Sequence, residues 1–439
     1  MTMLINYLRN ILFWFLDSIK GGYIRKQIKE IKYSVIHPES SNSENLKKKY
    51  IDKLLIHATN STPYYSSYKN FNSIQDFPVI KKVIIQQNFD KFQSTEYKDK
   101  DNFKVSTSGS TGVPFFLYQD KNKRRRNHSD VIYFLKESGF KIGNRLYELE
   151  VWRGHNEKNR LKAWLQNTIQ FDISKLTDKR IESFIELLKN DKQSKKTMLG
   201  FASSYEMIAQ YMERNNIFLD NLGLTSAIAN SEYLNPYTKT TLGKHLNTQI
   251  LSRYSSEEIG IIAQQTLNSP NSFVINHASY VVEVLQFDNN ESVKPGEFGR
   301  IVVTDLFNFA MPIIRYDTGD IAKLGINDEG VIQLDEIEGR KMDVIYDSDG
   351  NLISSFVVYT KFYKYYHLLK QYQFIQQSEK DYEVKLNLQG NTFAFEDDLI
   401  AIIKSDFGED SNVTITYVDE IPPLSSGKRR KVVNNYKKS

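Results

Sequence analysis

The sequence of 439 residues contains no cysteine. A cysteine nucleophile, a disulfide framework and a thiolate-ligated metal are therefore excluded. The absence of cysteine also fits a reducing compartment, and we expect a cytoplasmic protein.

The chain has no long hydrophobic run near its start. The longest one there, Ile11–Leu16, has six residues, whereas a membrane-spanning helix needs about 20. No small-residue cleavage site follows it, so a signal peptide is not expected. The pattern predicts that the protein is not an integral membrane protein.

Neither sign of charge is in large excess. The 58 Lys and Arg residues against 53 Asp and Glu residues give a net charge of +5, which is mild for this length, so no nucleic-acid partner is expected. A basic run at residues 121–126 could contact nucleic acid. A solvated helix face, or the steering of an anionic ligand, is the better explanation.

Residues 1–35 carry an amphipathic and basic helical pattern. Apolar residues from Leu4 to Ile19 recur at spacings of three and four, polar residues fall mostly opposite, and a basic stretch follows. Two interpretations stay open. The apolar side packs on the body of the protein, as in most amphipathic helices, which we favour, or it lies on an anionic membrane surface.

The rest of the chain favours an α/β fold. Strand-like and helix-like segments alternate over residues 103–310, which is typical of a mostly parallel sheet covered by helices. Residues 280–324 predict antiparallel strands. A boundary near residue 338 separates a small α+β unit whose basic end, from Lys428, is expected to fray. The clearest predicted strands are Tyr147–Trp152, Thr197–Phe201, Thr225–Ala229, Tyr280–Phe287, Gly299–Thr304, Asp320–Leu324, Tyr382–Leu388 and Val413–Val418, and the clearest helices are Ile181–Leu188, Tyr205–Arg214 and Phe395–Lys404.

The strongest local signal is the run TSGSTGVP at residues 107–114. Glycines let the backbone approach an anion, and exposed amides with hydroxyls can surround phosphate oxygens. The run is not a Walker P-loop, which needs a Gly-Lys-Ser/Thr ending. From composition alone, an ordinary turn is the commoner interpretation.

A second candidate is Arg253–Gly260, which holds adjacent carboxylates at Glu257 and Glu258 next to Tyr254. Such carboxylates can hold a hard cation such as Mg²⁺. They are also typical of two solvated glutamates at the start of a helix, where the dipole favours them. The residues alone favour the second interpretation.

The third candidate is the segment Ile314–Asp320. The Asp320 carboxylate could accept hydrogen bonds from a ribose diol, as acidic residues do in nucleotide sites. A plain turn between strands is the alternative.

The fourth candidate is Pro422–Lys428, where Lys428 follows a Ser-Ser-Gly stretch. A lysine beyond a mobile loop could bring one positive charge to a reacting phosphate. A frayed basic tail is the alternative, and it is the commoner one when this segment is taken by itself.

In this order, the four motifs resemble those of the adenylate-forming superfamily of acyl-CoA synthetases, adenylation domains and luciferases. The resemblance is closer to the phenylacetate–CoA ligase branch, in particular to its capsular-polysaccharide and coenzyme F390 synthetase-like members. Residues 62–65, 77–82 and 228–234 also match, so that the resemblance covers almost the whole chain.

The resemblance implies an ATP-dependent ligase. Such an enzyme activates a carboxylic acid as acyl-AMP with release of pyrophosphate, and an acceptor then displaces AMP. It implies ATP and Mg²⁺ as cofactors, and a large domain over residues 36–338 with mixed sheets covered by helices. A small mobile α+β lid domain over residues 339–439 would close on it.

The resemblance also implies roles for individual residues. Thr111, Glu258 and Lys428 would be catalytic, with Glu258 as the magnesium ligand and Lys428 stabilising charge during adenylation. The remaining residues would bind the nucleotide: Ser108, Gly109, Ser110, Thr111 and Gly112 at the phosphates, Asn230, Ser231, Glu232 and Tyr254 at the adenine, and Asp320 and Arg340 at the ribose.

Two positions depart from the family pattern. Ser255 stands where a glycine usually follows the tyrosine, and it either narrows the pocket or is tolerated. Met342-Asp343 stands where the family often has an acidic pair, which leaves the pivot of the hinge open.

Three functions stay open. The acceptor is a thiol, of CoA or a carrier protein, or else it is an amine, such as an amino sugar in cell-surface polysaccharide synthesis. The third possibility is a nucleotide-binding scaffold at the membrane without turnover, against which Glu258 and Lys428 argue. The expected location is the cytoplasm, with peripheral association at the inner membrane face as an option. The motifs do not identify the acid or the oligomeric state.

Overall fold

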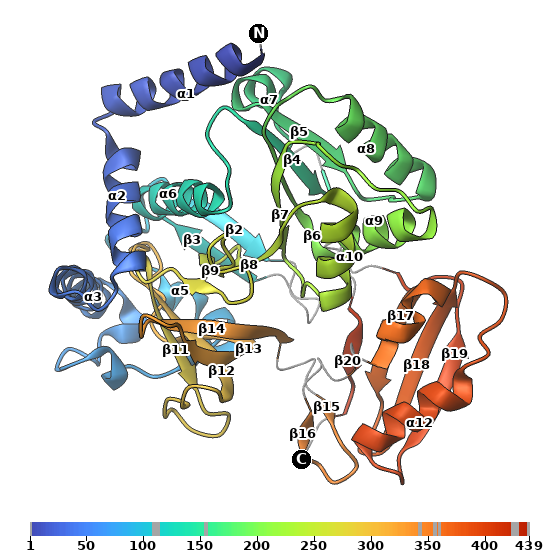
Figure 1. Cartoon of the computed structure of the whole chain (residues 1–439). Coiled ribbons are helices and arrows are strands. Elements are labelled where there is room, and N and C mark those ends of the chain that lie inside the picture. Colours follow the sequence, from blue (N-terminus) through green and yellow to red (C-terminus); the bar gives the residue numbers. More distant parts are fainter. Residues whose placement is uncertain are drawn as a thin grey trace. The chain divides into compact units, whose positions relative to one another are not determined.

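The computed structural model describes residues 2–107, 115–152, 157–340, 345–353, 358, 361–422 and 430–436. The chain forms two compact units, whose elements are labelled in Figure 1. Unit 1 contains Met1–Leu146, Leu161–Thr168 and Leu251–Ile337, and unit 2 contains Tyr147–Arg160, Ile169–Ile250 and Glu338–Ser439. The predicted domain limits at residues 35 and 338 stay predictions.

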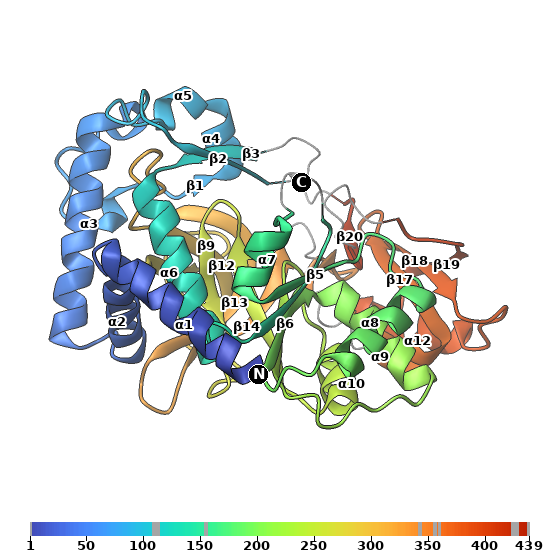
Figure 2. The ribbon, with the colours of Figure 1, turned by 90° about the horizontal axis from the view of Figure 1, so that it is seen from above.

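Unit 1 begins with three helices, α1 (Thr2–Ile19), α2 (Tyr23–Ile36) and α3 (Ser41–Ser61). The single helical pattern expected over residues 1–35 is interrupted, because Gly21 and Gly22 have φ angles of 91° and 66°. These left-handed values suit glycine. The chain therefore changes direction between α1 and α2 (Figures 1 and 2), and α2 packs against α6 (Lys121–Glu137).

Short elements connect these helices to the sheets of unit 1. They are the 3₁₀ turns η1 (Pro63–Tyr65) and η2 (Ile74–Asp76), β1 (Ile80–Lys81), α4 (Lys82–Gln87), α5 (Phe89–Phe92), β2 (Phe103–Thr107) and β3 (Phe115–Gln119). Strands β2 and β3 pair antiparallel, with Thr107 opposite Phe115. The helix α7 (Arg160–Gln166) lies almost wholly in unit 1 and has no buried residue.

The main sheet of unit 1 has the order β1-β13-β12-β11, with β14 paired to β13. Its long strands are β11 (Tyr280–Leu285), β12 (Phe298–Asp305), β13 (Tyr316–Ile326) and β14 (Ile332–Arg340). The pairs β11–β12 and β12–β13 are antiparallel, which confirms the strands predicted over residues 280–324. The short β1 joins in parallel, with Ile80 opposite Tyr316.

A second group of strands in unit 1 is β8 (Ile250–Ser256), β9 (Gly260–Gln264) and β10 (Val274–Ile275). The three pair antiparallel, and Ser256 lies opposite Gly260, so residues 257–259 form the turn between β8 and β9. One core cluster joins both groups and contains the buried side chains of Phe115, Ile259, Tyr280 and Tyr316.

Unit 2 contains the predicted strand–helix alternation. Its strands are β4 (Arg145–Glu150), β5 (Thr168–Asp172), β6 (Lys196–Phe201) and β7 (Leu224–Asn230), and its helices are α8 (Asp178–Asn190), α9 (Ala202–Arg214) and α10 (Pro236–Leu246). Strands β6 and β7 are parallel, with Gly200 opposite Ala229. The predicted helices over 181–188 and 205–214 are confirmed within α8 and α9.

The C-terminal part of unit 2 is α+β, as predicted. It contains β15 (Ile345–Tyr346), β16 (Leu352–Ile353), η4 (Tyr363–Leu368), β17 (Leu369–Gln376), β18 (Asp381–Leu388), α12 (Glu396–Phe407), β19 (Asn412–Tyr417) and β20 (Val432–Asn434). The strand order is β19-β18-β17-β20. The expectation that the basic end frays is wrong at β20, because Val432 pairs in parallel with Phe374 and Lys431 forms an ion pair with Glu206.

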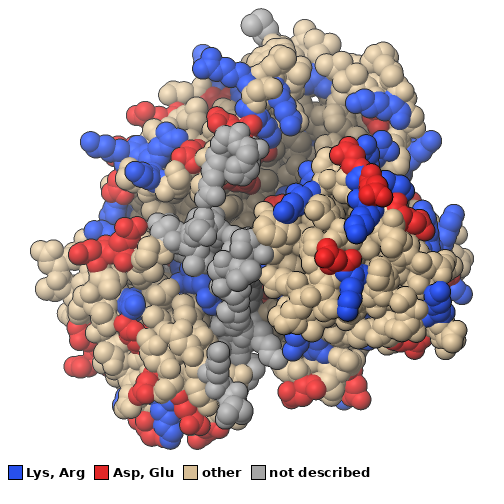
Figure 3. Space-filling view, turned by 180° about the vertical axis from the view of Figure 1, so that it is seen from behind, with Lys and Arg blue, Asp and Glu red and all other residues tan. Residues whose placement is uncertain are grey.

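Within the described residues, no helix is both long and apolar enough to cross a bilayer. On the face drawn in Figure 3, Lys and Arg side chains are scattered among Asp and Glu side chains. Two cations of the basic run at 121–126, Lys123 and Arg126, are fully buried, so the interpretation of this run as a solvated helix face is wrong for them.

Candidate nucleotide and metal site

Two of the four sequence motifs meet in unit 1 at Tyr254 and Asp320. The Tyr254 hydroxyl donates to Oδ2 of Asp320 over 2.7 Å and lies 3.1 Å from Oγ1 of Thr318. Thr318 Oγ1 in turn accepts from the Asp320 amide and donates to the Ile301 carbonyl. Burial, and then the Asp320 carboxylate, raise the pKa of Tyr254 well above its ordinary value. The hydroxyl therefore stays protonated and holds one carboxylate oxygen in place.

Asp320 lies within strand β13 rather than in a turn between strands, so the alternative interpretation of this motif is wrong. Gly319, with φ of 80°, allows a local irregularity there, and its amide donates to Asp317 Oδ1 over 3.0 Å.

Glu257 and Glu258 occupy the turn between β8 and β9, and not a helix start, so the interpretation as two solvated glutamates is wrong for Glu258. Glu257 is exposed, whereas Glu258 is 8% exposed. The hydroxyl of Tyr316 lies 3.4 Å from Oε1 of Glu258. Oε2 of Glu258 is buried and has no hydrogen-bond partner among the described residues. A buried carboxylate oxygen without a partner is costly unless a ligand satisfies it.

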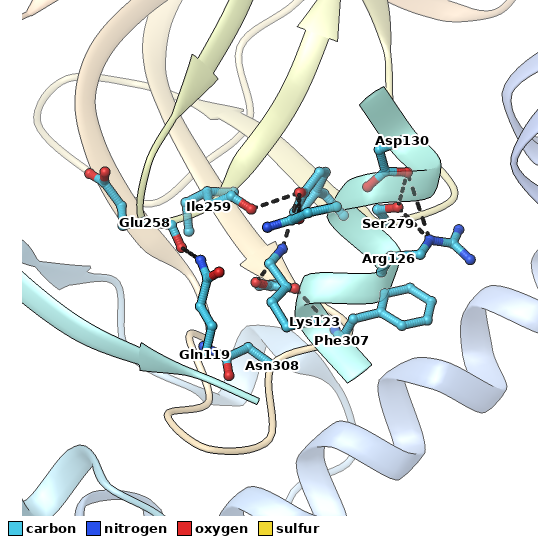
Figure 4. Close-up of polar contacts among 12 residues, drawn as sticks. Gln119, Lys123, Arg126, Asp130, Glu258, Ile259, Ser279, Phe307 and Asn308 are labelled. Atoms are coloured by element: carbon cyan, nitrogen blue, oxygen red, sulfur yellow. Dashed lines mark hydrogen bonds and ion pairs between the residues drawn. The ribbon is translucent and has the colours of Figure 1, made fainter. Parts of the chain in front are cut away.

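A buried polar network supports this turn from behind (Figure 4). Gln119 Nε2 donates to the Glu258 carbonyl over 3.2 Å, and the Tyr280 hydroxyl donates to the Ile259 carbonyl over 2.7 Å. Lys123 Nζ donates to the Tyr280 hydroxyl over 3.1 Å. The Glu258 carboxylate points away from the network in Figure 4. Hydrogen bonds from Gln119 and Tyr280 therefore fix the backbone of the turn, and they do not use the Glu258 carboxylate.

Lys123 also forms a fully buried ion pair with Asp305, with Nζ 2.6 Å from Oδ2. The other oxygen of Asp305 accepts from the Phe307 amide over 3.0 Å. Burial raises the pKa of Asp305, and the ammonium group of Lys123 opposes that shift.

Gly260 allows the close packing at this turn. Its φ is 109°, and a Cβ atom would lie 2.6 Å from the Tyr280 hydroxyl and 2.7 Å from Asn127 Oδ1. A side chain there would displace the hydroxyl that holds the Ile259 carbonyl.

The predicted phosphate-binding residues Ser108, Gly109, Ser110, Thr111 and Gly112 lie outside the described residues, but the strands on both sides are described. Phe115, the first residue of β3, is buried and stacks on Tyr316, with ring centroids 6.4 Å apart and an interplanar angle of 7°. Tyr316 also contacts Glu258. Phe115, at the end of the first motif, therefore lies in the same core cluster as residues of the second and third motifs. Lys82, the first residue of α4, also contacts Phe115, with its Nζ 4.8 Å from the centre of the ring.

The predicted adenine-binding residues Asn230, Ser231 and Glu232 follow strand β7 in unit 2. Ser231 has φ of 67°, a left-handed value that is uncommon for a residue with a side chain. The Glu232 side chain accepts from the Ser203 amide over 2.8 Å and so caps the start of α9. Asn230 Oδ1 and Trp152 Nε1 of the same unit are buried without a hydrogen-bond partner among the described residues. Unpartnered buried groups of this kind suit a ligand.

The two remaining predicted residues are less informative. Arg340 ends strand β14. Lys428 lies outside the described residues, two positions before Arg430, whose carbonyl accepts from Gln373 Nε2 over 2.8 Å.

The residues of the buried network, Gln119, Lys123, Tyr280 and Asp305, were not identified from the sequence. The spacing of Lys123 and Arg126, three residues apart in a helix, was the available signal, since it places both on one face of α6. Because these two residues stand in a run of cations, the sequence favoured a solvated helix face for them.

Among the described residues there is no group of three or more His, Cys, Asp and Glu side chains that could hold a metal ion by themselves. Glu258 nevertheless fits Mg²⁺, because this ion is commonly bound by one or two carboxylates together with substrate phosphates. The buried, unpartnered Oε2 of Glu258 is a suitable ligand atom.

Comparison with protein families and sequences relates the chain to CapK. Residues 345–435 match the family described as the CapK C-terminal domain. Protein CapK of Staphylococcus aureus is 24% identical over 379 residues, which are 83% of this chain and 81% of that protein.

Solved structures with a similar fold include a CoA ligase and an ATP-bound protein. A 2-hydroxyisobutyryl-CoA ligase, in the postadenylation state with R3-HIB-AMP, superposes with a TM-score of 0.72 at 16% identity over 90% of each chain. ATP-bound MatB from Rhodopseudomonas palustris gives a TM-score of 0.56 at 13% identity over 75% of this chain and 66% of its own. The chain thus shares its fold with these structures, which confirms the α/β fold class and agrees with the resemblance to adenylate-forming enzymes seen in the sequence.

Proposed function

We propose that this chain, with its adenylate-forming fold, activates a carboxylic acid with ATP and transfers the acyl group to a thiol. The observation that carries the proposal is the arrangement of Tyr254, Asp320 and Glu258 in unit 1. Tyr254 fixes the Asp320 carboxylate over 2.7 Å, and the nearby turn presents a buried Glu258 oxygen without a partner. Both features suit a nucleotide with its cation.

In the proposed complex, the chain binds the two ends of the nucleotide by different groups. Asp320 accepts hydrogen bonds from the ribose hydroxyls, and the sequence resemblance assigns Arg340 to the same sugar. Asn230, Ser231 and Glu232 border the adenine mainly through their backbone, which agrees with the use of the Glu232 side chain as a helix cap. Tyr254 packs beside the base. The unpartnered Asn230 Oδ1 supports this assignment.

Glu258 would hold the magnesium ion, which when bound offsets the negative charge of the phosphates. Gln119 and Tyr280 keep the backbone of residues 258 and 259 fixed, so that this carboxylate needs little reorganisation.

Adenylation joins the acid to the α-phosphate. A substrate carboxylate oxygen forms a bond to the α-phosphorus, the bond from that phosphorus to the oxygen bridging to the β-phosphate breaks, and pyrophosphate leaves with the electron pair. Ser108, Gly109, Ser110, Thr111 and Gly112 would donate hydrogen bonds to the phosphates. Lys428 would add one positive charge where negative charge develops, a contribution that electrostatic catalysis commonly makes.

Transfer to a thiol completes the proposed reaction. The sulfur of CoA or of a carrier protein forms a bond to the acyl carbon, the bond from that carbon to the AMP oxygen breaks, and the thiol proton is released. The likeness of the fold to CoA ligases supports this acceptor. The sequence resemblance to capsular-polysaccharide members of the branch favours an amine acceptor in cell-surface polysaccharide synthesis as the second candidate. In either case we expect the reaction in the cytoplasm.

The test is acid-dependent exchange of pyrophosphate into ATP across amino, hydroxy, aryl and fatty acids. Exchange with one class of acid would support the proposal and identify that class. The exchange should be lost in the variant Lys428→Ala while the variant still folds. That acid would then be supplied with CoA or with amines, and the product would be identified by mass spectrometry. Nucleotide binding without exchange under any acceptor condition would support a scaffold instead.

A further inference from the structure

Helix α1 contacts the rest of unit 1 mainly through polar side chains, with Phe13, beside His128 of α6, as an aromatic exception. Asn6 Oδ1 accepts from Asn167 Nδ2 over 3.1 Å, and Asn10 Nδ2 donates to the Ile142 carbonyl over 3.0 Å. Asp17 accepts from the amides of Ile24 and Arg25 at the start of α2, over 2.9 and 3.1 Å. Asn6 and Asp17 are the two buried residues of the helix. The side that a surface helix normally turns to solvent is here turned to the protein.

The opposite side of α1 exposes large apolar side chains. Their exposed fractions range from 43% at Leu12 to 71% at Met3. The exposed set is Met3, Leu4, Tyr7, Leu8, Ile11, Leu12, Phe15, Leu16 and Ile19. The interpretation favoured from the sequence, that the apolar side packs on the body of the protein, is therefore wrong. Contiguous exposed apolar surface of this kind is rare unless it binds something.

Helix α7 extends this surface. Leu161, Trp164 and Leu165 are 67%, 60% and 41% exposed. The two helices are neighbours in unit 1, because the Arg9 guanidinium lies 5.0 Å from the centre of the Trp164 ring and Asn167, which follows α7, donates to Asn6. We call the exposed apolar residues of α1 and α7 the N-terminal apolar surface.

The exposed charged residues of the segments 2–36 and α7 are all cations. Residues 2–36 contain two carboxylates, and both are engaged: Asp17 by the start of α2, and Glu30 by Arg126 and Tyr50. The exposed charged residues of the segment are Lys20, Arg25, Lys26, Lys29 and Lys32. The Arg25 guanidinium lies 5.2 Å from the ring centre of Trp14, which brings this cation to α1 itself. The sequence of α7 adds Arg160 and Lys162 and no acid.

We propose that the N-terminal apolar surface docks on an anionic lipid membrane. A helix that carries apolar residues on one side and cations beside them lies in the interface plane, with its apolar side among the acyl chains and its cations at the headgroups. A second copy of the chain is a poorer partner, because a two-fold contact would bring cations against cations. The proposal is independent of the proposed catalytic function.

The test is co-sedimentation of the full chain with vesicles of phosphatidylcholine mixed with phosphatidylglycerol, and with phosphatidylcholine alone. We expect binding to the anionic vesicles, and weaker binding at high salt. The combined variant Leu8→Gln, Ile11→Gln, Phe15→Gln should bind at least about a hundredfold more weakly, since each of these side chains contributes roughly tenfold when it leaves water. Glutamine keeps the helix propensity of leucine, so α1 should still form.

A matched control replaces three exposed apolar residues elsewhere in unit 1, by Ile56→Gln, Val83→Gln and Ile326→Gln, which are 54%, 48% and 49% exposed. This variant should bind vesicles as the wild type does. Loss of one cation by Lys26→Gln should weaken binding about fivefold, because a basic residue near an anionic leaflet contributes about that factor. Binding of the first variant equal to that of the wild type would overturn the proposal.

Trp164 gives an independent readout. The tryptophan fluorescence should shift to shorter wavelength when anionic vesicles are added, as for tryptophan entering the interface, and the shift should be smaller in Trp164→Phe, which keeps Trp14 in α1. If the wild-type chain binds no vesicles, and sedimentation in solution shows dimers that the triple variant lacks, the surface is an interface between two copies and the membrane proposal is wrong.

Discussion

Replacing Lys123 by methionine removes the positive charge from a buried ion pair. The ammonium group lies 2.6 Å from Asp305 Oδ2, and both side chains are fully buried. Methionine has a similar length, so the stem of the side chain is replaced without a large cavity. The variant therefore isolates the electrostatic consequence, which is a carboxylate left in the core with the Phe307 amide as its remaining described partner.

The expected loss is about 3–5 kcal/mol of unfolding free energy near neutral pH, the usual cost of removing one partner from a buried pair. The loss depends on pH. Burial already raises the pKa of Asp305, and without Lys123 the pKa rises further. Between the ordinary and the raised value, the native state binds a proton that the unfolded state does not, so stability falls as pH rises, by up to about 1.4 kcal/mol per unit.

The assay is urea unfolding followed by tryptophan fluorescence and circular dichroism, compared at about pH 5 and about pH 8. Trp14 and Trp164 belong to unit 1, which holds the ion pair. The double variant Lys123→Met, Asp305→Asn should recover most of the stability, because no charge is then buried. A loss below about 1 kcal/mol that is equal at both pH values would refute the reasoning.

Three further predictions concern the candidate site and its support. Glu258→Gln should lower acid-dependent pyrophosphate exchange about a hundredfold or more while leaving the urea midpoint no lower, because Gln119 holds the backbone and not the carboxylate. Tyr254→Phe removes one hydrogen bond to the Asp320 carboxylate and should raise KM for ATP about tenfold with a smaller change in kcat, measured by initial rates. Glu232→Ala removes the cap of α9 and should cost about 1 kcal/mol in thermal or urea unfolding.

The sequence was a good guide to the regular elements. Strands such as β11 and β12 were predicted because apolar and polar residues alternate along a segment that is bounded by turn residues. Such an alternation is a local property of the sequence. The motif containing Glu258 was found, but its local pattern indicated a helix start. Glu258 is positioned by the β8–β9 hairpin, in which Tyr254 pairs with Ala263. This pairing joins residues nine positions apart and cannot be predicted from the local sequence pattern.

The burial of charge was the least predictable feature. Lys123 and Arg126 stand in a run of cations that favours a solvated face, and only the packing of α6 against Tyr280, Asp305 and Ser279 gives them partners. These partners lie about 150 or more residues away in sequence. For α1, the apolar period was recognised correctly, whereas the side that faces the protein is decided by Asn6 and Asn10 meeting groups near residues 142 and 167.

The way α1 is held has a thermodynamic consequence. A helix docked by its apolar side hides hydrocarbon from water, and releasing it raises the heat capacity of the chain. The two buried residues of α1, Asn6 and Asp17, are polar, and polar groups change the heat capacity in the opposite direction. Calorimetry of a chain without residues 1–20 should therefore find nearly the same heat-capacity change on unfolding as for the full chain, although eighteen residues of helix have been removed.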